Sequence, residues 1–176
     1  MKKLFLGASI TMALAVSGAN AAEIQGQGTV NFKGEVIDSP CSIAPESVDQ
    51  TIQFGQISKA VLEKGGESVR KSVDIKLINC EFDAPKTVTA TFSGATGDTT
   101  KNELTTAGNT GVAIVMSAAD GTQVSFDGSS PAGKLALKPG ENTLKYVTWV
   151  KKGTDTKGAV SEGAFEAVAQ FNLTYN

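Results

Sequence analysis

Histidine is absent from this sequence of 176 residues, and cysteine, tryptophan and tyrosine are scarce: there are two cysteines, one tryptophan and two tyrosines. Without histidine, Ser-His and Cys-His catalytic pairs are impossible. Two cysteines alone are too few ligands for a zinc site unless carboxylates complete it. A carboxylate pair for glycoside cleavage stays open, because any two acids can meet in a β fold. No motif points to catalysis, so we expect no enzyme, no catalytic residue, no metal and no cofactor.

A long hydrophobic run is also missing. The apolar stretch from Leu4 to Val16 follows Lys2 and Lys3 and is shorter than the ~20 residues that span a bilayer. It leads to the small residues Ala19-Asn20-Ala21, which is the layout of a secretory signal. We expect residues 1–21 to be removed by cleavage after Ala21 or one residue later, and no membrane span.

The remaining chain is mildly acidic. Loss of Lys2 and Lys3 leaves 14 basic against 18 acidic residues, so the net charge moves from −2 to −4. This balance argues against nucleic acid or an anionic membrane as a partner. The hydrophobic content of 40% suits one domain with a core, and no internal repeat or linker suggests a second.

Export decides how the two cysteines are interpreted. In an oxidising compartment, an even number of cysteines predicts a disulfide, here between Cys41 and Cys80. The 39 positions between them correspond to a stabilisation of about 4 kcal/mol on the chain-entropy model. Each cysteine adjoins strand-like sequence, so the bond is expected to join two strands.

Short runs rich in valine, isoleucine, threonine and aromatic residues recur along the chain, separated by glycine- and proline-bearing turns. Such spacing predicts an all-β sandwich or barrel. One helical turn is expected within 57–66, with Ser58 as its cap and Gly65 at its end. Beyond the two terminal runs, the predicted strands are 51–54, 72–79, 87–92, 111–116, 123–126, 134–137 and 143–150.

The two terminal runs show the alternation of a strand with one apolar face. The first, "GTVNFKGEVID", follows the short glycine-bearing stretch "AEIQGQG" and places Val30, Phe32, Gly34 and Val36 on one face. The last, "SEGAFEAVAQFNLTYN", is apolar at every second position. The two strands can pair within one chain, as in an ordinary sandwich, or between copies of the chain. The apolar positions of the last run are Phe165, Ala167, Ala169, Phe171, Leu173 and Tyr175.

Four stretches carry a family resemblance: "QGQGTVNFKGEVIDSPCSI", "VDQTIQFGQISK", "VDIKLINCEF" and "SEGAFEAVAQFNLTY". Through them the whole chain after the signal resembles the shaft subunits of chaperone–usher fimbriae, with the major pilins of P-type pili nearest. The family's penultimate tyrosine and its glycine fourteen positions from the end correspond to Tyr175 and Gly163. Its disulfide corresponds to Cys41 and Cys80. Asn176 stands where the family commonly has glutamine.

The resemblance implies an incomplete immunoglobulin-like β-sandwich that lacks its last strand. Residues 22–38 would be a donor strand and 39–176 the pilin domain, whose C-terminal strand borders an acceptor groove. A periplasmic pilus chaperone would fill this groove until, at an outer-membrane usher, the arm of the next subunit replaces it; chaperone–pilin complementation is a known case of strand addition. The donor residues would be Val30, Phe32, Gly34 and Val36, and the acceptor and chaperone-binding residues Gly163, Phe165, Ala167, Ala169, Phe171, Leu173 and Tyr175.

The resemblance thus predicts a structural subunit of a surface fimbria that supports adhesion. Its partners would be identical subunits, the chaperone, the usher and minor or tip pilins, and it would pass through the periplasm to the bacterial surface. The alternatives are a minor or adaptor pilin, or a monomeric exported β-sandwich that acts as a binding module. Gly34 is predicted to approach the acceptor backbone closely, the alternative being a bulge or turn between two short strands.

Overall fold

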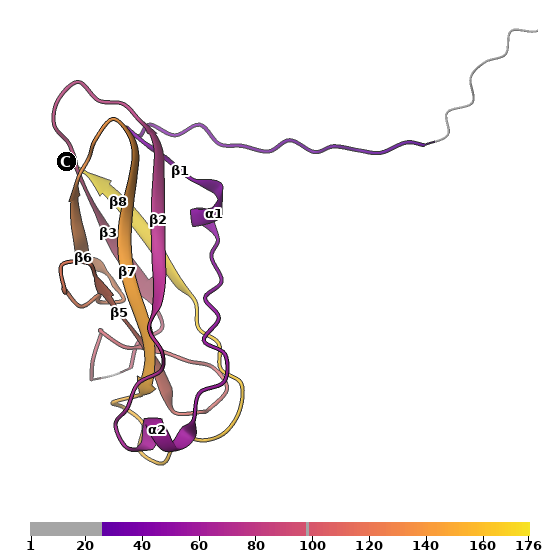
Figure 1. The fold of residues 1–176 in the computed structure, drawn as a ribbon, viewed down its shortest axis with the longest axis vertical. Helices are drawn as coiled ribbons and strands as arrows, with labels where there is room; N and C mark the ends of the chain where they lie inside the picture. The colour runs from indigo at the N-terminus through magenta and orange to yellow at the C-terminus, as the bar shows by residue number, and fades with distance from the viewer. Residues whose placement is uncertain (1–25, 98) are drawn as a thin grey trace, which may run out of the picture. The chain divides into compact units, whose positions relative to one another are not determined.

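The computed structural model describes residues 26–97 and 99–176 (Figure 1). The predicted signal, residues 1–21, lies outside the described residues. The chain divides into two units, Met1–Val36 and Ile37–Asn176. From residue 26 to Val36, which we call the arm, the first unit contains no helix or strand and is exposed throughout. The second unit holds all the regular secondary structure of the described chain.

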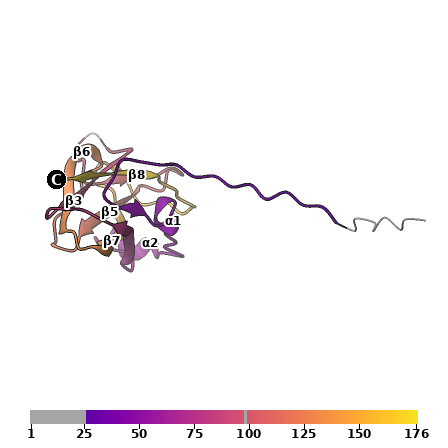
Figure 2. The same cartoon turned by 90° about the horizontal axis from the view of Figure 1, so that it is seen from above.

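The second unit is a sandwich of two antiparallel sheets, as the sequence predicts. One sheet has the strand order β1-β2-β7-β5-β4 and the other β6-β3-β8. Seen from above, the layer with β6 and β8 is separate from the layer with β5 and β7 (Figure 2). The strands are β1 Ser42–Ile43, β2 Lys71–Cys80, β3 Thr87–Gly94, β4 Leu104–Thr105, β5 Val112–Ala118, β6 Asp127–Ala136, β7 Gly140–Lys152 and β8 Ala169–Tyr175; the helices are α1 Pro45–Val48 and α2 Lys59–Glu63.

Most predicted strands are found, with four exceptions, the first being the first terminal run, residues 28–38, which forms no strand. The segments 72–79, 87–92, 111–116 and 143–150 correspond to β2, β3, β5 and β7, and 134–137 overlaps the end of β6. The segment 123–126 forms only one isolated bridge, between Ser117 and Gln123. The strand predicted at 51–54 is not formed, and the last run becomes a strand only from Ala169 onward.

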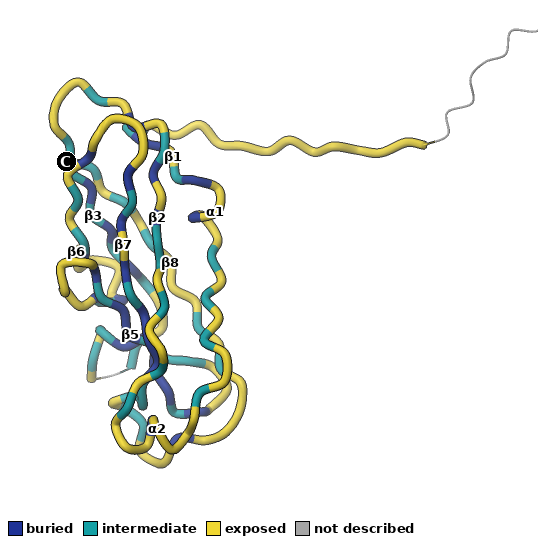
Figure 3. Tube along the Cα trace, in the orientation of Figure 1, coloured by how far each residue is buried: buried dark blue, intermediate teal, exposed yellow. Residues whose placement is uncertain are grey.

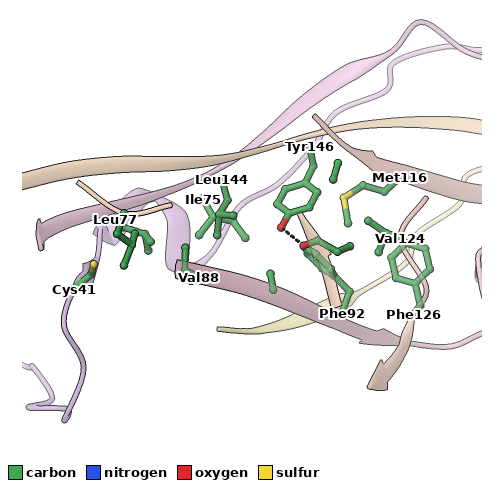
Figure 4. Packing of buried hydrophobic residues seen from close by; sticks show 14 of the residues in the cluster. Cys41, Ile75, Leu77, Val88, Phe92, Met116, Val124, Phe126, Leu144 and Tyr146 are labelled. Atoms are coloured by element: carbon green, nitrogen blue, oxygen red, sulfur yellow. Dashed lines mark hydrogen bonds between the residues drawn. The ribbon is translucent and has the colours of Figure 1, made fainter. Parts of the chain in front are cut away.

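The core lies between the two sheets (Figure 4). Tyr146 of β7, which is 1% exposed, packs edge-on against Phe92 of β3 with ring centroids 5.0 Å apart. Its hydroxyl donates a hydrogen bond to the carbonyl of Ala132 in β6 at 3.0 Å. A Cβ on Gly133 would lie 2.9 Å from that hydroxyl, and Gly133 has φ +73°, so both space and backbone favour glycine. Tyr146 therefore joins the two sheets.

The disulfide between Cys41 and Cys80 is confirmed. Cys41 immediately precedes β1 and Cys80 ends β2, with their Cα atoms 4.1 Å apart. Both residues are at most 2% exposed. The bond thus ties the start of the domain, just before β1, to the end of β2, which is the strand that pairs with β1.

The predicted helical turn is also present. Helix α2 begins after Ser58, although the Ser58 side chain makes no capping bond, and the chain leaves it through Gly65 at φ +79°. Leu62 is the residue of α2 that is buried. Helix α1 was not predicted. Within residues 26–97 and 99–176, no helix is long and apolar enough to cross a membrane.

Candidate functional site

Strand β8 has one paired edge and one open edge. It pairs with β3 from Tyr175 opposite Val88 to Ala169 opposite Gly94, and it is the last strand of its sheet. Thr87 and Asn176 exchange both backbone hydrogen bonds, at 2.8 and 2.9 Å. Because hydrogen-bonded pairs alternate in an antiparallel ladder, the even-numbered residues of β8 bond to β3. The N–H and C=O groups of the odd-numbered residues, 169 to 175, therefore point to the open edge.

The same odd-numbered positions carry the predicted acceptor side chains. Phe171, Leu173 and Tyr175 are half-buried and pack against the main core, whereas the even-numbered residues between them are exposed. Ala169 is exposed. The open edge of β8 thus combines unpaired backbone groups with an apolar face that is only partly covered.

Facing β8 is an extended segment, residues 49–57, which we call the wall (Figure 3). Ile52, Phe54 and Ile57 are half-buried and alternate with exposed residues between 51 and 54. Within the described part of the chain, residues 51–57 make no backbone hydrogen bond to one another or to another segment. The wall therefore has the pattern of a strand but lacks a neighbouring strand.

Two polar side chains fasten the start of the wall to β2; we call Ser47 and Gln50 the clasp. The Ser47 hydroxyl accepts a hydrogen bond from the Lys76 N–H at 3.0 Å and donates one to the Asp74 carbonyl at 3.3 Å. The Gln50 side-chain amide donates to the same Asp74 carbonyl at 3.0 Å and to the Ser47 carbonyl. Ser47 and Gln50 thus bond to backbone groups of β2 that a longer β1 would otherwise occupy. The chain after β1 can therefore leave the five-stranded sheet.

A groove of about 940 Å³ lies between the wall and β8. Its lining is mostly apolar, and its carboxylates are Asp49 on the wall and Glu166 just before β8. No group of three metal-binding side chains occurs in residues 26–97 and 99–176. The floor is formed by core side chains of both sheets, among them Ile75, Phe92, Leu104, Ile114, Met116 and Phe126.

One end of the groove is closed by an aromatic contact, which we call the end pair. The rings of Phe54 on the wall and Phe165 before β8 lie 6.3 Å apart between centroids. Both pack on a second, smaller core of Leu62, Val112, Val150 and Val160.

The chain changes partner before β8, which explains why the predicted strand begins late. Glu166 forms a bridge with Ala107, not with β3, and Ala107 N–H donates to the Glu166 carbonyl at 2.8 Å. Phe165 and Ala167 nevertheless remain half-buried. Gly163 has φ +148°, a conformation that favours glycine, and lies outside the groove lining.

The groove floor is braced by a buried carboxylate. Glu103, 6% exposed and next to Leu104, forms an ion pair with the Lys151 ammonium at 2.5 Å and accepts a hydrogen bond from the Thr154 N–H at 2.7 Å. Burial alone would raise the pKa of Glu103, but the bonds from Lys151 and Thr154 outweigh it and hold that pKa below its ordinary value.

The arm carries the predicted donor residues on its described part. Val30, Phe32 and Val36 are 73%, 90% and 100% exposed. A Cβ on Gly34 would meet no atom within 4 Å, so nothing in the arm itself requires a glycine there. The sequence predicted a role for the arm and for β8, but it gave no role to the wall, the clasp or the end pair, which border the groove. The alternation in "TIQF" is the signal that pointed to the wall.

The comparisons with known proteins agree with this geometry. The fimbrial protein family matches residues 30–176. The Pap fimbrial major pilin protein of Escherichia coli is 46% identical over 99% of this chain and 100% of its own length. Among solved structures, the P pilus rod subunit PapA aligns with a TM-score of 0.74 at 46% identity, covering 78% of this chain and all of that one. A structure of a chaperone–usher pilus aligns with a TM-score of 0.79 at 46% identity, covering 86% and 97%. The chain therefore belongs to the fimbrial protein family, as a non-enzymatic major pilin of a surface pilus.

Proposed function

We propose that copies of this chain polymerise into the pilus rod by donor-strand exchange, in which residues 30–36 of one copy fill the groove of the next. The observation that carries the proposal is the open edge of β8 beside an apolar groove. Strand β8 offers seven residues, and the alternating run from Val30 to Val36 also has seven. A strand inserted there would pair with the odd-numbered backbone groups of β8 and cover its apolar face.

The relatives support the same proposal. The solved structure at 46% identity is that of a rod subunit, and its likeness covers 78% of this chain. Before assembly, an empty groove would leave apolar surface and an unpaired strand edge in water, which favours aggregation. A periplasmic chaperone that lends a strand, and an outer-membrane usher at which the strands exchange, would protect the subunit. Gly163 would then help to turn the chain toward the acceptor strand.

The side chains favour one register for the inserted strand. We infer an antiparallel pairing with β8 in which Gly34 lies opposite Phe171. Residues directly opposite one another share a face, so the even-numbered donor side chains enter the groove and the odd-numbered ones face solvent. The absent side chain of Gly34 then leaves room for the Phe171 ring. In this register Phe32 lies opposite Leu173 and Val36 opposite the small Ala169.

Disulfide trapping tests this pairing. In the inferred register Lys33 lies opposite Asn172, on the exposed face, in a pair without mutual backbone bonds. Such pairs have Cα atoms about 4.5 Å apart, which a disulfide tolerates. Chains that carry both Lys33→Cys and Asn172→Cys should form covalent multimers after mild oxidation. These should appear as a ladder on a denaturing gel after boiling without reductant and collapse to monomer when reductant is added.

Matched controls place the second cysteine two residues away from position 172 along β8, on the same face of the strand. Lys33→Cys combined with Gln170→Cys or with Thr174→Cys reports a register shifted by two residues in either direction. Both should give much less covalent multimer than the pair with Asn172→Cys. The natural cysteines are bonded to each other and at most 2% exposed, so they should not compete. No covalent multimer from any of the three pairs, although polymer forms, would refute donor-strand exchange through the arm.

A further inference from the structure

The end pair closes the groove at the end from which β8 begins. Phe54 and Phe165 stand on opposite sides of the groove and meet with ring centroids 6.3 Å apart. Both are half-buried, and the residues on which they pack are separate from most of the main core. The smaller core therefore holds the two rings in place. A strand inserted in the groove would run toward them.

The residue that follows the apolar run of the arm is charged. In the register inferred above, Asp38 lies opposite Ala167, just short of the end pair. If the strand moved two residues deeper, Asp38 would lie opposite Phe165, with its side chain on the inward face. A carboxylate among aromatic rings would lose its hydration without gaining a partner, which is unfavourable. The carboxylate of Glu166, which directly follows Phe165 in the sequence, is also negative and cannot compensate the charge of Asp38.

The opposite shift is disfavoured by packing. Two residues shallower, Val36 would face the Phe171 ring, and Val30 would lie beyond Tyr175, where β8 ends. Val30 would thus lose its contact with β8, and Val36 would crowd the Phe171 ring. Packing disfavours the deep register as well, because it would place Phe32 opposite the Phe171 ring. The deep register meets the end pair in addition, and this second obstacle is absent from the shallow register.

We propose that Phe54 and Phe165 act as an end-stop that fixes the register at which the arm of a second copy is accepted. The proposal rests on the proposed function. Phe54 is the better residue to alter, because it lies on the wall, outside every strand, and its removal leaves the four buried residues of the smaller core in place. Phe54→Ala should open the end of the groove and permit the deeper register.

The trapping pairs measure this directly in assembled polymer. With Phe54 present, the Lys33→Cys and Asn172→Cys pair should give at least about tenfold more covalent multimer than the Lys33→Cys and Gln170→Cys pair. A tenfold ratio corresponds to less free energy than the burial of one apolar side chain. Phe54→Ala should raise the product of the deeper pair severalfold, although the pair at 172 should stay the more abundant, because the deeper register still places Phe32 opposite Phe171. Val69→Ala, which removes an exposed apolar side chain outside the groove, should leave the ratio unchanged.

The outcomes separate this proposal from the previous one. An unchanged ratio in Phe54→Ala, with strong trapping at 172, would overturn the end-stop and leave donor-strand exchange intact. A ratio near one with Phe54 present would overturn it as well. If Phe54→Ala yields too little polymer to measure, Phe54→Leu decides, since it keeps an apolar side chain but removes the ring. A rise of the deeper product in Phe54→Leu supports the end-stop, and an unchanged ratio overturns it.

Discussion

Replacing Ser47 by alanine removes a hydroxyl that occupies two backbone groups of β2. The Lys76 N–H, bonded at 3.0 Å, loses its acceptor beside a residue that is only 1% exposed. The Asp74 carbonyl keeps its bond from Gln50 at 3.0 Å. This bond is part-buried, and leaving such a donor unpaired costs about 1–3 kcal/mol. For a domain of this size we expect the melting temperature to fall by about 3–12 °C.

Gln50→Ala should cost less, because the Asp74 carbonyl then keeps its bond from Ser47. The double variant removes both donors to that carbonyl, so its loss should exceed the sum of the single losses by about 0.5 kcal/mol or more. The measurement is a double-mutant cycle of thermal unfolding. The protein for it is the full chain extended by a flexible linker and a second copy of residues 28–38, which fills the groove; we call it the extended chain.

Gln53→Ala is the matched control, since Gln53 is an exposed glutamine of the same wall. It should change stability by at most about 0.5 kcal/mol. If Ser47→Ala left the melting temperature of the extended chain unchanged, the clasp would be refuted as the anchor of the wall. Strictly additive losses in the double variant would show that Ser47 and Gln50 do not share the Asp74 carbonyl in solution.

Three further predictions concern the arm, the disulfide and the buried carboxylate. Gly34→Asn should weaken or abolish assembly, because overpacking costs about 1–3 kcal/mol; wild-type amounts of polymer on an unboiled denaturing gel would contradict the pocket for a glycine. Cys80→Ala should remove about 4 kcal/mol, a large share of a domain's stability; equal periplasmic levels of variant and wild type would show the bond to Cys41 to be dispensable. The pKa of Glu103 is lowered in the folded protein, so its stabilisation is present above the ordinary value of 4.5 and is lost as the pH falls below it. Glu103→Gln in the extended chain should therefore lower the melting temperature at pH 7 and show a smaller deficit at acid pH; an equal deficit at both would contradict this assignment.

Local sequence patterns predicted the strands that have a neighbour in the chain. Four predicted strands pair with a neighbouring strand on both edges, so apolar alternation and β-branched residues were sufficient to predict them. They are β2, β3, β5 and β7. The wall has the same pattern in "TIQF", but it forms no strand because no neighbouring segment of the described chain pairs with it. The prediction failed there for a physical reason: pairing, not propensity, makes a strand.

Strand β6 was hidden for the opposite reason. Its sequence "DGSSPAGK" has the composition of a turn, yet it pairs with β3 through two irregularities in register. An edge strand tolerates Pro131, since the missing N–H is not needed on the outer side. The clasp left no local signal either, because Ser47 and Gln50 act on backbone groups that lie 24 to 29 residues away in the chain.

The central claim is that the sandwich lacks one strand, which the arm of another copy supplies. The most direct test compares the melting temperature of the extended chain with that of a chain carrying a scrambled copy of residues 28–38. Filling the groove would bury Val30, Phe32 and Val36, which are now 73–100% exposed, and pair the free edge of β8. We predict a soluble monomer that no longer polymerises and melts about 10 °C or more above the scrambled control. Equal melting temperatures, with the unextended subunit already a stable monomer, would mean that the sandwich is complete without the arm.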